Sequence, residues 1–236
     1  MNISNEEKLM YKVMKAIYDS GIPVSFKGSL VLKAFLLESG YGKDTRHTVD
    51  IDANWNGETT PTMKQITASL QKALDRGGIN LDVTYYRRYG NNRSAGFELR
   101  DKSSRELLFT MDIDVNRPIV KTKIYEVSGL CFRGVVPSQM IADKLSVISV
   151  DKVFRRIKDL VDLYYLSHVC SFNREDILSV LKSNRKELGT FDGFLNRTKD
   201  LKHSYEKFRF VGGVNKPTFE EVYLAVKTFI VDVLPR

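Results

Sequence analysis

The chain has 236 residues, of which 42% are hydrophobic and 28% charged, enough for one large domain or two modest ones with a real core. No run of about 18 apolar residues is present, and the polar start MNISNEEKLMYK is unlike a signal peptide, so we expect a cytoplasmic protein without a membrane span. A formal charge of +8, from 37 basic and 29 acidic residues, favours polyanionic partners such as nucleic acid or nucleotide phosphates.

The first forty residues predict a helix, a short strand and a second helix. Residues 4–19 carry apolar side chains at helical spacing, and SGIP ends this first helix. A strand then runs to Lys27, turns at Gly28-Ser29 and enters a helix that ends at Gly40. A turn of small residues before a helix leaves backbone N–H groups that can bind phosphate, although it is also an ordinary way to begin a helix.

Residues 45–55, TRHTVDIDANW, place two carboxylates on one side of a strand. Asp50 and Asp52 alternate with hydrophobic residues over the predicted strand 48–55, so both side chains point the same way. Like charges this close repel each other. Either both carboxylates are well solvated, or a cation lies between them.

The next segment predicts one helix and then a β-rich region. TTPTMKQITASLQKALDRGG has Thr59 or Thr60 as N-cap, Pro61 in the first turn and a glycine pair at its end. From about residue 80 to 134 turn-like residues separate strands. The expected strands lie within residues 79–88, 95–101, 105–115 and 120–127.

The strand LLFTMDIDVN repeats the acidic pattern. Asp112 and Asp114 alternate with hydrophobic residues, so this strand could bring another carboxylate towards Asp50 and Asp52. Oxygen ligands of this kind suit hard cations such as Mg²⁺, and two such ions roughly 3.5–4 Å apart assist phosphoryl-type transfer. The alternative is a pair of acidic strands that simply face solvent.

After CFRGVVPSQ the chain is almost all helical. Periodicity of 3.6 residues predicts helices within residues 138–150, 152–169, 173–188 and 218–234. The boundary therefore falls near Pro137, which gives an α/β (α+β) domain over residues 1–136 and a helical domain over residues 137–236. Cys131 and Cys170 lie far apart in sequence and are expected to be buried thiols rather than a disulfide.

The order of strand, Gly-Ser turn, helix and DxD strand resembles the nucleotidyltransferase superfamily. More narrowly, the chain resembles the AbiEii/AbiGii-type toxin nucleotidyltransferases. Five segments match in the family's order: KGSLVLKAFL, RHTVDIDANW, MDIDVN, VPSQMIADKLSVI and RRIKDLVDLYYL, between residues 27 and 166. The resemblance implies a nucleotidyltransferase-fold mixed sheet with N-terminal helices, a C-terminal helical bundle and an active site in the cleft between them.

The first two matching segments imply a nucleotide and metal site. Gly28 and Ser29 would line the triphosphate, and Asp50 and Asp52 would bind Mg²⁺ or Mn²⁺. Arg46 would steady phosphate or the acidic pair. The family often has GGT-A-L where this chain has KGSLVL, a difference that leaves the preferred base of the NTP open.

The other matching segments imply further site residues. Asp114 resembles the third metal-binding carboxylate, because it is followed by an aliphatic and a small polar residue, and Asp112 is the competing choice. Lys144 matches a lysine that contacts nucleotide phosphates, and Asp159 matches a position treated as catalytic. Asp162 shares a helical face with Asp159, whereas Lys158 and Arg155 are expected to form helix-surface ion pairs.

The resemblance implies a metal-assisted enzyme that moves a nucleoside monophosphate from an NTP to an acceptor hydroxyl. In related toxins the acceptor is RNA, in some cases the 3′ end of tRNA. The family also implies the toxin of a toxin–antitoxin or phage-defence (abortive-infection) pair, with a separately encoded antitoxin. Transfer to a small molecule or to a protein is an alternative, as is a non-catalytic module that binds RNA or a partner. The role of residues 167–236 is left open.

Overall fold

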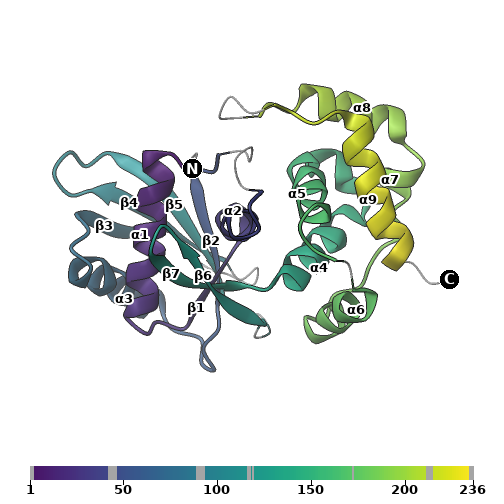
Figure 1. The fold of residues 1–236 in the computed structure, drawn as a ribbon. Coiled ribbons are helices and arrows are strands. Elements are labelled where there is room, and N and C mark those ends of the chain that lie inside the picture. Colours follow the sequence, from purple (N-terminus) through teal and green to yellow (C-terminus); the bar gives the residue numbers. More distant parts are fainter. Residues whose placement is uncertain are drawn as a thin grey trace.

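The computed structural model describes residues 3–41, 47–88, 94–115, 118, 120–171, 173–210 and 215–233, with backbone alone at 151 and 152. One half of the molecule is a mixed sheet with helices packed on it, and the other half is built of helices (Figure 1). The expected α/β fold with a mixed sheet is therefore confirmed. Among the described residues, no helix is both long and apolar enough to cross a membrane.

Among the residues that the structure describes, the sheet half contains seven strands. Its elements are α1 (Asn5–Asp19), β1 (Val24–Lys27), α2 (Gly28–Glu38), β2 (Asp50–Trp55), α3 (Met63–Arg76), β3 (Leu81–Arg87), β4 (Ser94–Asp101), β5 (Leu107–Asp114), β6 (Thr122–Val127) and β7 (Leu130–Val135). The helical half begins two residues after β7. Its elements are α4 (Pro137–Ile148), the 3₁₀ helix η2 (Asp151–Arg155), α5 (Ile157–Ser167), α6 (Arg174–Ser183), α7 (Asp192–Leu195), α8 (Thr198–Lys207) and α9 (Phe219–Val233).

The strand order β3-β4-β5-β2-β1-β7-β6 places the two acidic strands side by side. β2 runs parallel to β5, with Asp52 opposite Asp112 and Asn54 opposite Asp114, and antiparallel to β1. Side chains directly opposite each other lie on the same face of a sheet. Aspartates and Asn54 thus share one face, while Ile51 and other buried residues of these strands form the core on the opposite face.

Helix α1 is fixed at its start and along its buried face. The Ser4 hydroxyl accepts from the backbone N–H of Glu7, and the Glu7 carboxylate accepts from the backbone N–H of Ser4. This capping box satisfies amides that the first turn would otherwise leave unbonded. Further along, the ring of Tyr11 stacks on Phe132 at 5.7 Å, and the Glu7 carboxylate lies 2.7 Å from the buried ammonium of Lys33 in α2. Helices α1 and α2 are therefore joined by an ion pair.

Helix α3 begins later than the sequence pattern predicts. Its N-cap is Thr62, not Thr59 or Thr60, and Pro61 precedes the helix instead of lying in its first turn. The Thr62 hydroxyl accepts from the backbone N–H of Gln65, and the Gln65 side chain accepts from the backbone N–H of Thr62. This reciprocal pair satisfies two backbone donors, which the earlier threonines could not do at that spacing.

Strand β7 was not among the predicted strands. Residues 130–135 pair with β6 through a two-residue turn whose Ser128 and Gly129 have φ values of 52° and 79°. Left-handed conformations at both central positions match the twist of a hairpin. Leu130–Val135 lacks a regular alternation of apolar and polar residues, because it lies in the sheet interior between β1 and β6.

The segment 152–169, predicted as one helix, is two elements. The 3₁₀ helix η2 ends at Arg155, and α5 begins at Ile157 after Arg156, whose φ and ψ of −116° and 27° are not helical. Helices α7 and α8 were not predicted either. α8 is mostly polar and buries only Leu201 and Tyr205, so its sequence gives a weak periodic signal.

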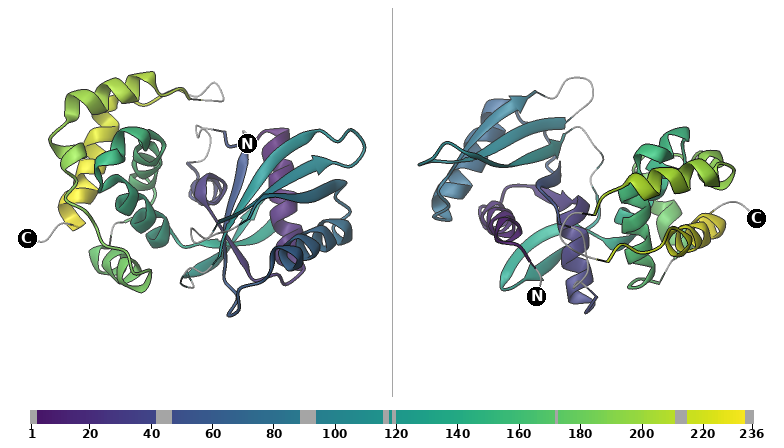
Figure 2. Two further views of the ribbon diagram at one scale, coloured as in Figure 1. Left: turned by 180° about the vertical axis from the view of Figure 1, so that it is seen from behind. Right: turned by 90° about the horizontal axis from the view of Figure 1, so that it is seen from above.

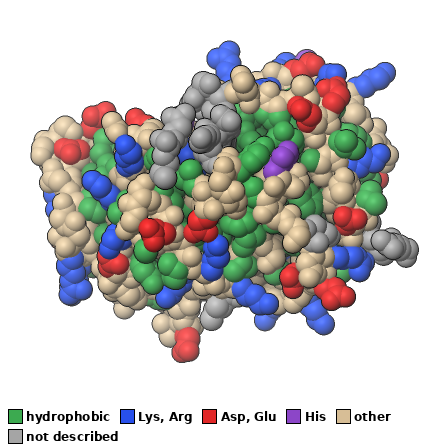
Figure 3. Space-filling view, in the orientation of Figure 1, with side chains coloured by type: hydrophobic (Ala, Val, Ile, Leu, Met, Phe, Trp, Pro, Cys, Tyr) green, Lys and Arg blue, Asp and Glu red, His purple; other side chains and the backbone are tan. Residues whose placement is uncertain are grey.

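Helix α2 lies between the sheet and the helical half, and the two halves keep this relation in the other views (Figures 1 and 2). On the face shown in Figure 3, basic and acidic side chains are interspersed, so the positive excess does not form one patch there. Cys131 and Cys170 are free thiols, as expected, but both are half-buried rather than buried.

Candidate active site

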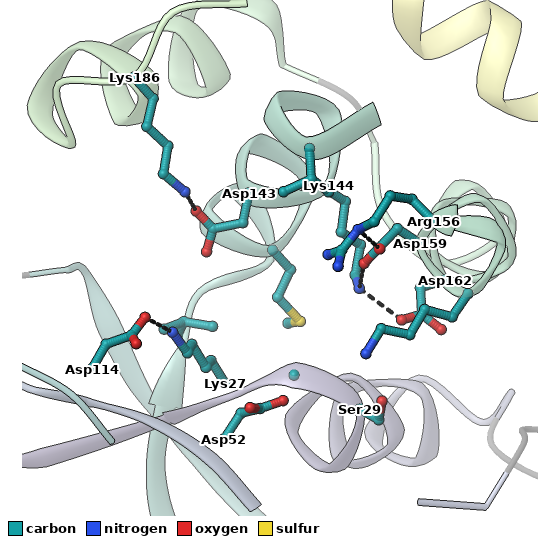
Figure 4. A pocket seen from close by; sticks show the side chains of 15 residues that line it. Lys27, Ser29, Asp52, Asp114, Asp143, Lys144, Arg156, Asp159, Asp162 and Lys186 are labelled. Carbon is teal, nitrogen blue, oxygen red and sulfur yellow. Dashed lines mark hydrogen bonds and ion pairs between the residues drawn. The ribbon is translucent and has the colours of Figure 1, made fainter. Parts of the chain in front are cut away.

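A cleft of about 390 Å³ lies between the sheet and helices α4 and α5 (Figure 4). The β1–α2 turn and the acidic strands line it from the sheet half, and α4, α5 and the segment after α6 line it from the helical half. The lining side chains are those of Lys27, Ser29, Asp52, Asp114, Val135, Met140, Asp143, Lys144, Val147, Arg156, Lys158, Asp159, Asp162 and Lys186, together with Gly28.

The β1–α2 turn brings backbone against a carboxylate. Gly28 has a φ of +72°, and a Cβ at this position would lie 2.5 Å from Oδ2 of Asp52. Only glycine fits without strain or collision, since side chains disfavour this φ and the space is already occupied. Helix α2 begins at Gly28, and Lys27 makes no side-chain cap to its first turn. The first N–H groups of α2 thus lie beside Asp52, where a helix favours anions.

The structure separates the candidate carboxylates. Asp52 and Asp114 line the cleft. Asp50 is exposed at the start of β2, where the hydroxyl of Thr48 donates to it at 2.8 Å, and it lies outside the cleft lining. Asp112 also lies outside the lining and pairs with Arg87 at 2.7 Å. Of the two candidates on β5, Asp114 therefore faces the cleft.

Burial raises the pKa of the Asp52 carboxyl, and the nearby charges of Asp50 and Asp112 add to the increase. The ammonium groups of Lys27 and Lys158 lower the same pKa, but not enough to reverse the shift. A raised pKa means that the ionised form of Asp52 is under-compensated by its surroundings. A bound cation at this place would relieve that deficit.

The ammonium of Lys27 lies at the place where a cation would compensate the charge of Asp52. Its Nζ is 2.6 Å from Oδ2 of Asp114, whose other oxygen accepts a short hydrogen bond from Ser94. In this arrangement no three acidic, histidine or cysteine side chains among the described residues converge as a metal site. The donor set nevertheless fits Mg²⁺, because it offers carboxylate oxygens beside an under-compensated charge. A metal ion at Asp114 would have to displace the ammonium of Lys27.

Lys144 is held by two aspartates on the opposite wall. Its ammonium lies 2.6 Å from Asp162 and 3.3 Å from Asp159, and all three side chains are buried. The guanidinium of Arg156 lies 2.8 Å from the second oxygen of Asp159 (Figure 4). Lys144 and Asp159 match separate motifs of the sequence, and the structure brings them together with Gly28, Ser29 and Asp52 in one cleft.

Several cleft residues were not singled out as site residues from the sequence. Lys158, expected in a helix-surface pair, lines the cleft, and it directly precedes Asp159 in a matching motif. Asp143 precedes Lys144 in the same way and pairs with Lys186 at 2.6 Å. Neighbourhood to a motif could have indicated Lys158 and Asp143, whereas Lys186 carries no sequence signal. Arg46 lies outside the described residues, as does the last residue of MDIDVN.

Known proteins resemble this chain in sequence pattern and in fold. A family model described as the nucleotidyl transferase AbiEii toxin of a type IV toxin–antitoxin system matches residues 19–223. No curated protein matches the chain in sequence. Among solved structures, the nucleotidyltransferase toxin MenT4 of Mycobacterium tuberculosis is similar, with a TM-score of 0.62 and 14% identity over 97% of this chain and 82% of that one. At this identity the likeness to MenT4 shows a shared fold.

The matched range 19–223 extends from the end of α1 into α9 and contains every residue that lines the cleft. It therefore covers both walls of the site, not an isolated motif. The chain belongs to the AbiEii family of toxin nucleotidyltransferases and is itself a nucleotidyltransferase.

Proposed function

We propose that the protein transfers a nucleoside monophosphate from a Mg²⁺-bound NTP to a hydroxyl group of RNA, with tRNA as the first candidate, and acts as the toxin partner of a separate antitoxin. One observation carries this proposal. One cleft is lined by the helix N-terminus at Gly28 and Ser29, by the carboxylates of Asp52 and Asp114, and by the buried Lys144. These are the parts that phosphoryl-type transfer needs: donors for phosphate, ligands for a metal ion and a fixed cation.

The triphosphate is assigned to the start of α2. Backbone N–H groups at Gly28 and Ser29 lie at the positive end of the helix. Lys144 projects from the opposite wall of the same cleft, and Lys158 lines it as well. Two cations facing a helix N-terminus favour a polyanion between them.

Asp50, Asp52 and Asp114 are the proposed metal ligands. Asp52 and Asp114 already line the cleft, and Asp50 is two residues from Asp52 on the same face of β2. A bound Mg²⁺ would neutralise phosphate charge and favour attack by the acceptor oxygen. The carboxylates themselves fix where the α-phosphate of the NTP can lie, next to the phosphate-binding turn.

In the proposed reaction, the acceptor hydroxyl oxygen forms a bond to the α-phosphorus while the bond from this phosphorus to the bridging oxygen breaks. Pyrophosphate leaves, and the hydroxyl proton passes to solvent. Both oxygens of Asp159 are already engaged, one with Lys144 and one with Arg156. We therefore assign Asp159 to holding these cations at the cleft, as a positioning residue rather than a proton acceptor.

The charge of the cleft supports RNA over a cationic small molecule. A pocket for a cationic small molecule would carry an excess of acidic side chains, whereas here Asp143 and Asp114 are paired with Lys186 and Lys27. The excess of +8 on the whole chain also favours a polyanion. The proposed domains divide the cleft in the same way as its two walls. Residues 1–136 supply the proposed metal ligands and the phosphate-binding turn, and residues 137–236 complete the cleft.

The test uses purified protein with Mg²⁺, each of the four α-³²P-labelled NTPs and total RNA from cells. We expect label on RNA of tRNA size with the unmodified protein and a loss of at least about a hundredfold in Asp52→Asn. Asp82→Asn is the matched control, because Asp82 is a strand residue of the same sheet that pairs with Arg105 and does not line the cleft. It should label RNA normally.

Label on a polypeptide instead of RNA would move the assignment to a protein acceptor. Equal labelling of RNA by Asp52→Asn and the unmodified protein would refute the metal site. Binding of NTP without transfer to any RNA, protein or small molecule would leave a binding module.

A further inference from the structure

A second cavity of about 160 Å³ adjoins the cleft at the Lys27–Asp114 ion pair. It shares Lys27, Asp114, Asp143 and Lys186 with the first cavity but contains neither Gly28 nor Ser29. Its other lining residues are Asn54, Pro118, Val120, Gln139, Asn184 and Arg185. The cleft thus has two compartments, one at the phosphate-binding turn and one beyond the carboxylates.

The direction of the reaction distinguishes these compartments. In an in-line displacement the attacking oxygen and the leaving oxygen lie on opposite sides of the phosphorus. If pyrophosphate leaves at the start of α2, the acceptor must approach from the other side of the carboxylates. Asn54 lies two residues after Asp52 on β2, and it is opposite Asp114, which lies two residues after Asp112 on β5. Asn54 and Asp114 both line the second cavity.

We propose that the second cavity binds the 3′-terminal nucleotide of the RNA acceptor, with its base against Asn54, Gln139 and Asn184. The inference rests on the proposed function, since it names where the acceptor of that reaction lies. The cavity is smaller than pockets for drug-sized ligands and suits a single planar base. Asp114 at its entrance would adjoin the terminal hydroxyl.

The polar wall of the cavity supports this assignment. Asn54 is 5% exposed, and its Oδ1 has no hydrogen-bond partner within the described part of the chain. Leaving a buried acceptor unpaired costs free energy, so such an atom in a cavity wall indicates a ligand. Gln139 is 2% exposed and accepts from Nδ2 of Asn184 at 2.9 Å.

Amide side chains offer a donor and an acceptor side by side. This combination reads the edges of nucleobases, and a well-placed amide can pair with a base through two hydrogen bonds. The Gln139 amide nitrogen donates to Asp143 at 2.9 Å, so the amides are linked to the ion pair with Lys186. The orientation of the Gln139 and Asn184 amides is thereby fixed before a base enters.

Two basic side chains of the second cavity could bind the phosphate that joins the terminal nucleotide to the rest of the RNA. Arg185 and Lys186 follow α6 directly, and both line the cavity. Lys186 is held by Asp143, whereas the exposed Arg185 extends at the rim. A base pocket with amides inside and arginine at the rim matches a nucleotide that enters base first.

The test compares Asn54→Ala and Asn184→Ala with Asn80→Ala, a control because Asn80 is exposed, bonded to Ser103 and absent from both cavities. Addition of one labelled nucleotide is measured on four short RNAs that differ only in their 3′-terminal base. We expect the unmodified protein to prefer one terminal base. Each cavity variant should raise KM for that RNA about tenfold and lose the preference, with KM for the NTP unchanged.

If Asn54→Ala fails to fold, Asn184→Ala still tests the inference, because Asn184 is half-exposed. A rise in KM for the NTP, or a changed choice among NTPs, with KM for RNA unchanged would place the base of the NTP in this cavity and overturn the inference. Unchanged kinetics in both variants would also overturn it. Failure of the unmodified protein to label any RNA is a different result, because it rejects the proposed function itself.

Discussion

The Nζ atom of Lys27 lies 2.6 Å from Oδ2 of Asp114, although β1 and β5 are separated in the sheet by β2. The lysine side chain therefore reaches across the strand that carries Asp52. It is the residue directly before the turn at Gly28, and it lines both compartments of the cleft. This ammonium compensates part of the carboxylate charge, so Lys27 and the metal ion of the proposed function would compete for Asp114.

The competition predicts that Lys27→Met binds divalent metal more tightly. A unit positive charge about 4 Å from another costs from about 1 kcal/mol in water to about 4 kcal/mol near a protein surface, so we expect at least a fivefold gain. Mn²⁺ titration followed by electron paramagnetic resonance, without nucleotide, measures this affinity. Lys15→Met is the control, because Lys15 pairs with Asp19 on the solvent-facing side of α1. Weaker Mn²⁺ binding in Lys27→Met would show that the lysine supports the metal site.

Gly28→Ala should abolish nucleotide transfer by displacing Asp52. The new Cβ would lie 2.5 Å from Oδ2 of Asp52, in addition to the strain of a φ of +72°. Gly21→Ala is a close control, because Gly21 has a φ of +70° and an added Cβ there would have no atom of the described residues within 4 Å. Both variants should lose about 1–2 kcal/mol of stability to the backbone strain. Only Gly28→Ala should lose Mn²⁺ binding and activity; equal loss in both would point to strain alone.

Lys144→Ala should destabilise the protein as well as inactivate it. The substitution leaves the buried carboxylates of Asp159 and Asp162 close together without the ammonium that lies between them. Breaking a buried ion pair costs about 3–5 kcal/mol. Urea unfolding measures this difference, with Lys202→Ala as the exposed control, since Lys202 pairs with Glu220 at the surface. A small loss of stability in Lys144→Ala would mean that water enters and solvates the aspartates.

The Glu7–Lys33 pair predicts an acid-dependent loss of stability. Burial raises the pKa of Glu7, but hydrogen bonds from Lys33, the Ser4 amide and His47 outweigh it, so the pKa lies below its ordinary value of 4.5. A lowered native pKa adds stability that is complete above the ordinary value and disappears as pH falls through the native value.

Glu7→Gln should therefore lower the free energy of unfolding at neutral pH by about 3–5 kcal/mol. The difference from the unmodified protein should shrink as pH falls from about 4.5. Urea unfolding between pH 7 and pH 3 tests both parts. Glu6→Gln, a substitution in the same helical turn at an exposed position, should change the free energy of unfolding by less than about 1 kcal/mol. A constant difference between Glu7→Gln and the unmodified protein over this range would contradict the linkage.

The sequence predicted elements whose signals are local. The strand before Lys27, the turn at Gly28 and the acidic strands β2 and β5 follow from residue type and period, and all are present. Strand β7 was missed because Leu130–Val135 lies in the interior of the sheet, between β1 and β6. Its own sequence does not alternate between apolar and polar residues, so it gives no sign of this pairing. The break at Arg156 was missed because the apolar spacing continues through it.

The same distinction applies to the site. Asp52, Lys144 and Asp159 stand in motifs, and the fold brings them to one cleft. Lys27, Lys186 and Asn54 are cleft residues of ordinary type, and their significance depends on partners far away in sequence. Whether Asp112 or Asp114 faces the cleft could not be decided by alternation, because both lie on the same face of β5. Packing of the helical half, not the period of the strand, decides it.

The chain passes from the sheet to the helices through Val136 alone, since β7 ends at Val135 and α4 begins at Pro137. During synthesis Gly28, Asp52 and Asp114 leave the ribosome before Lys144 and Asp159, because they precede them in the sequence. Domains generally fold as units in the order of their synthesis. A nascent chain that has completed its sheet would hold the carboxylates without the opposite wall. Both walls of the cleft are therefore complete only after synthesis has passed Lys186, the last residue in the sequence that lines it.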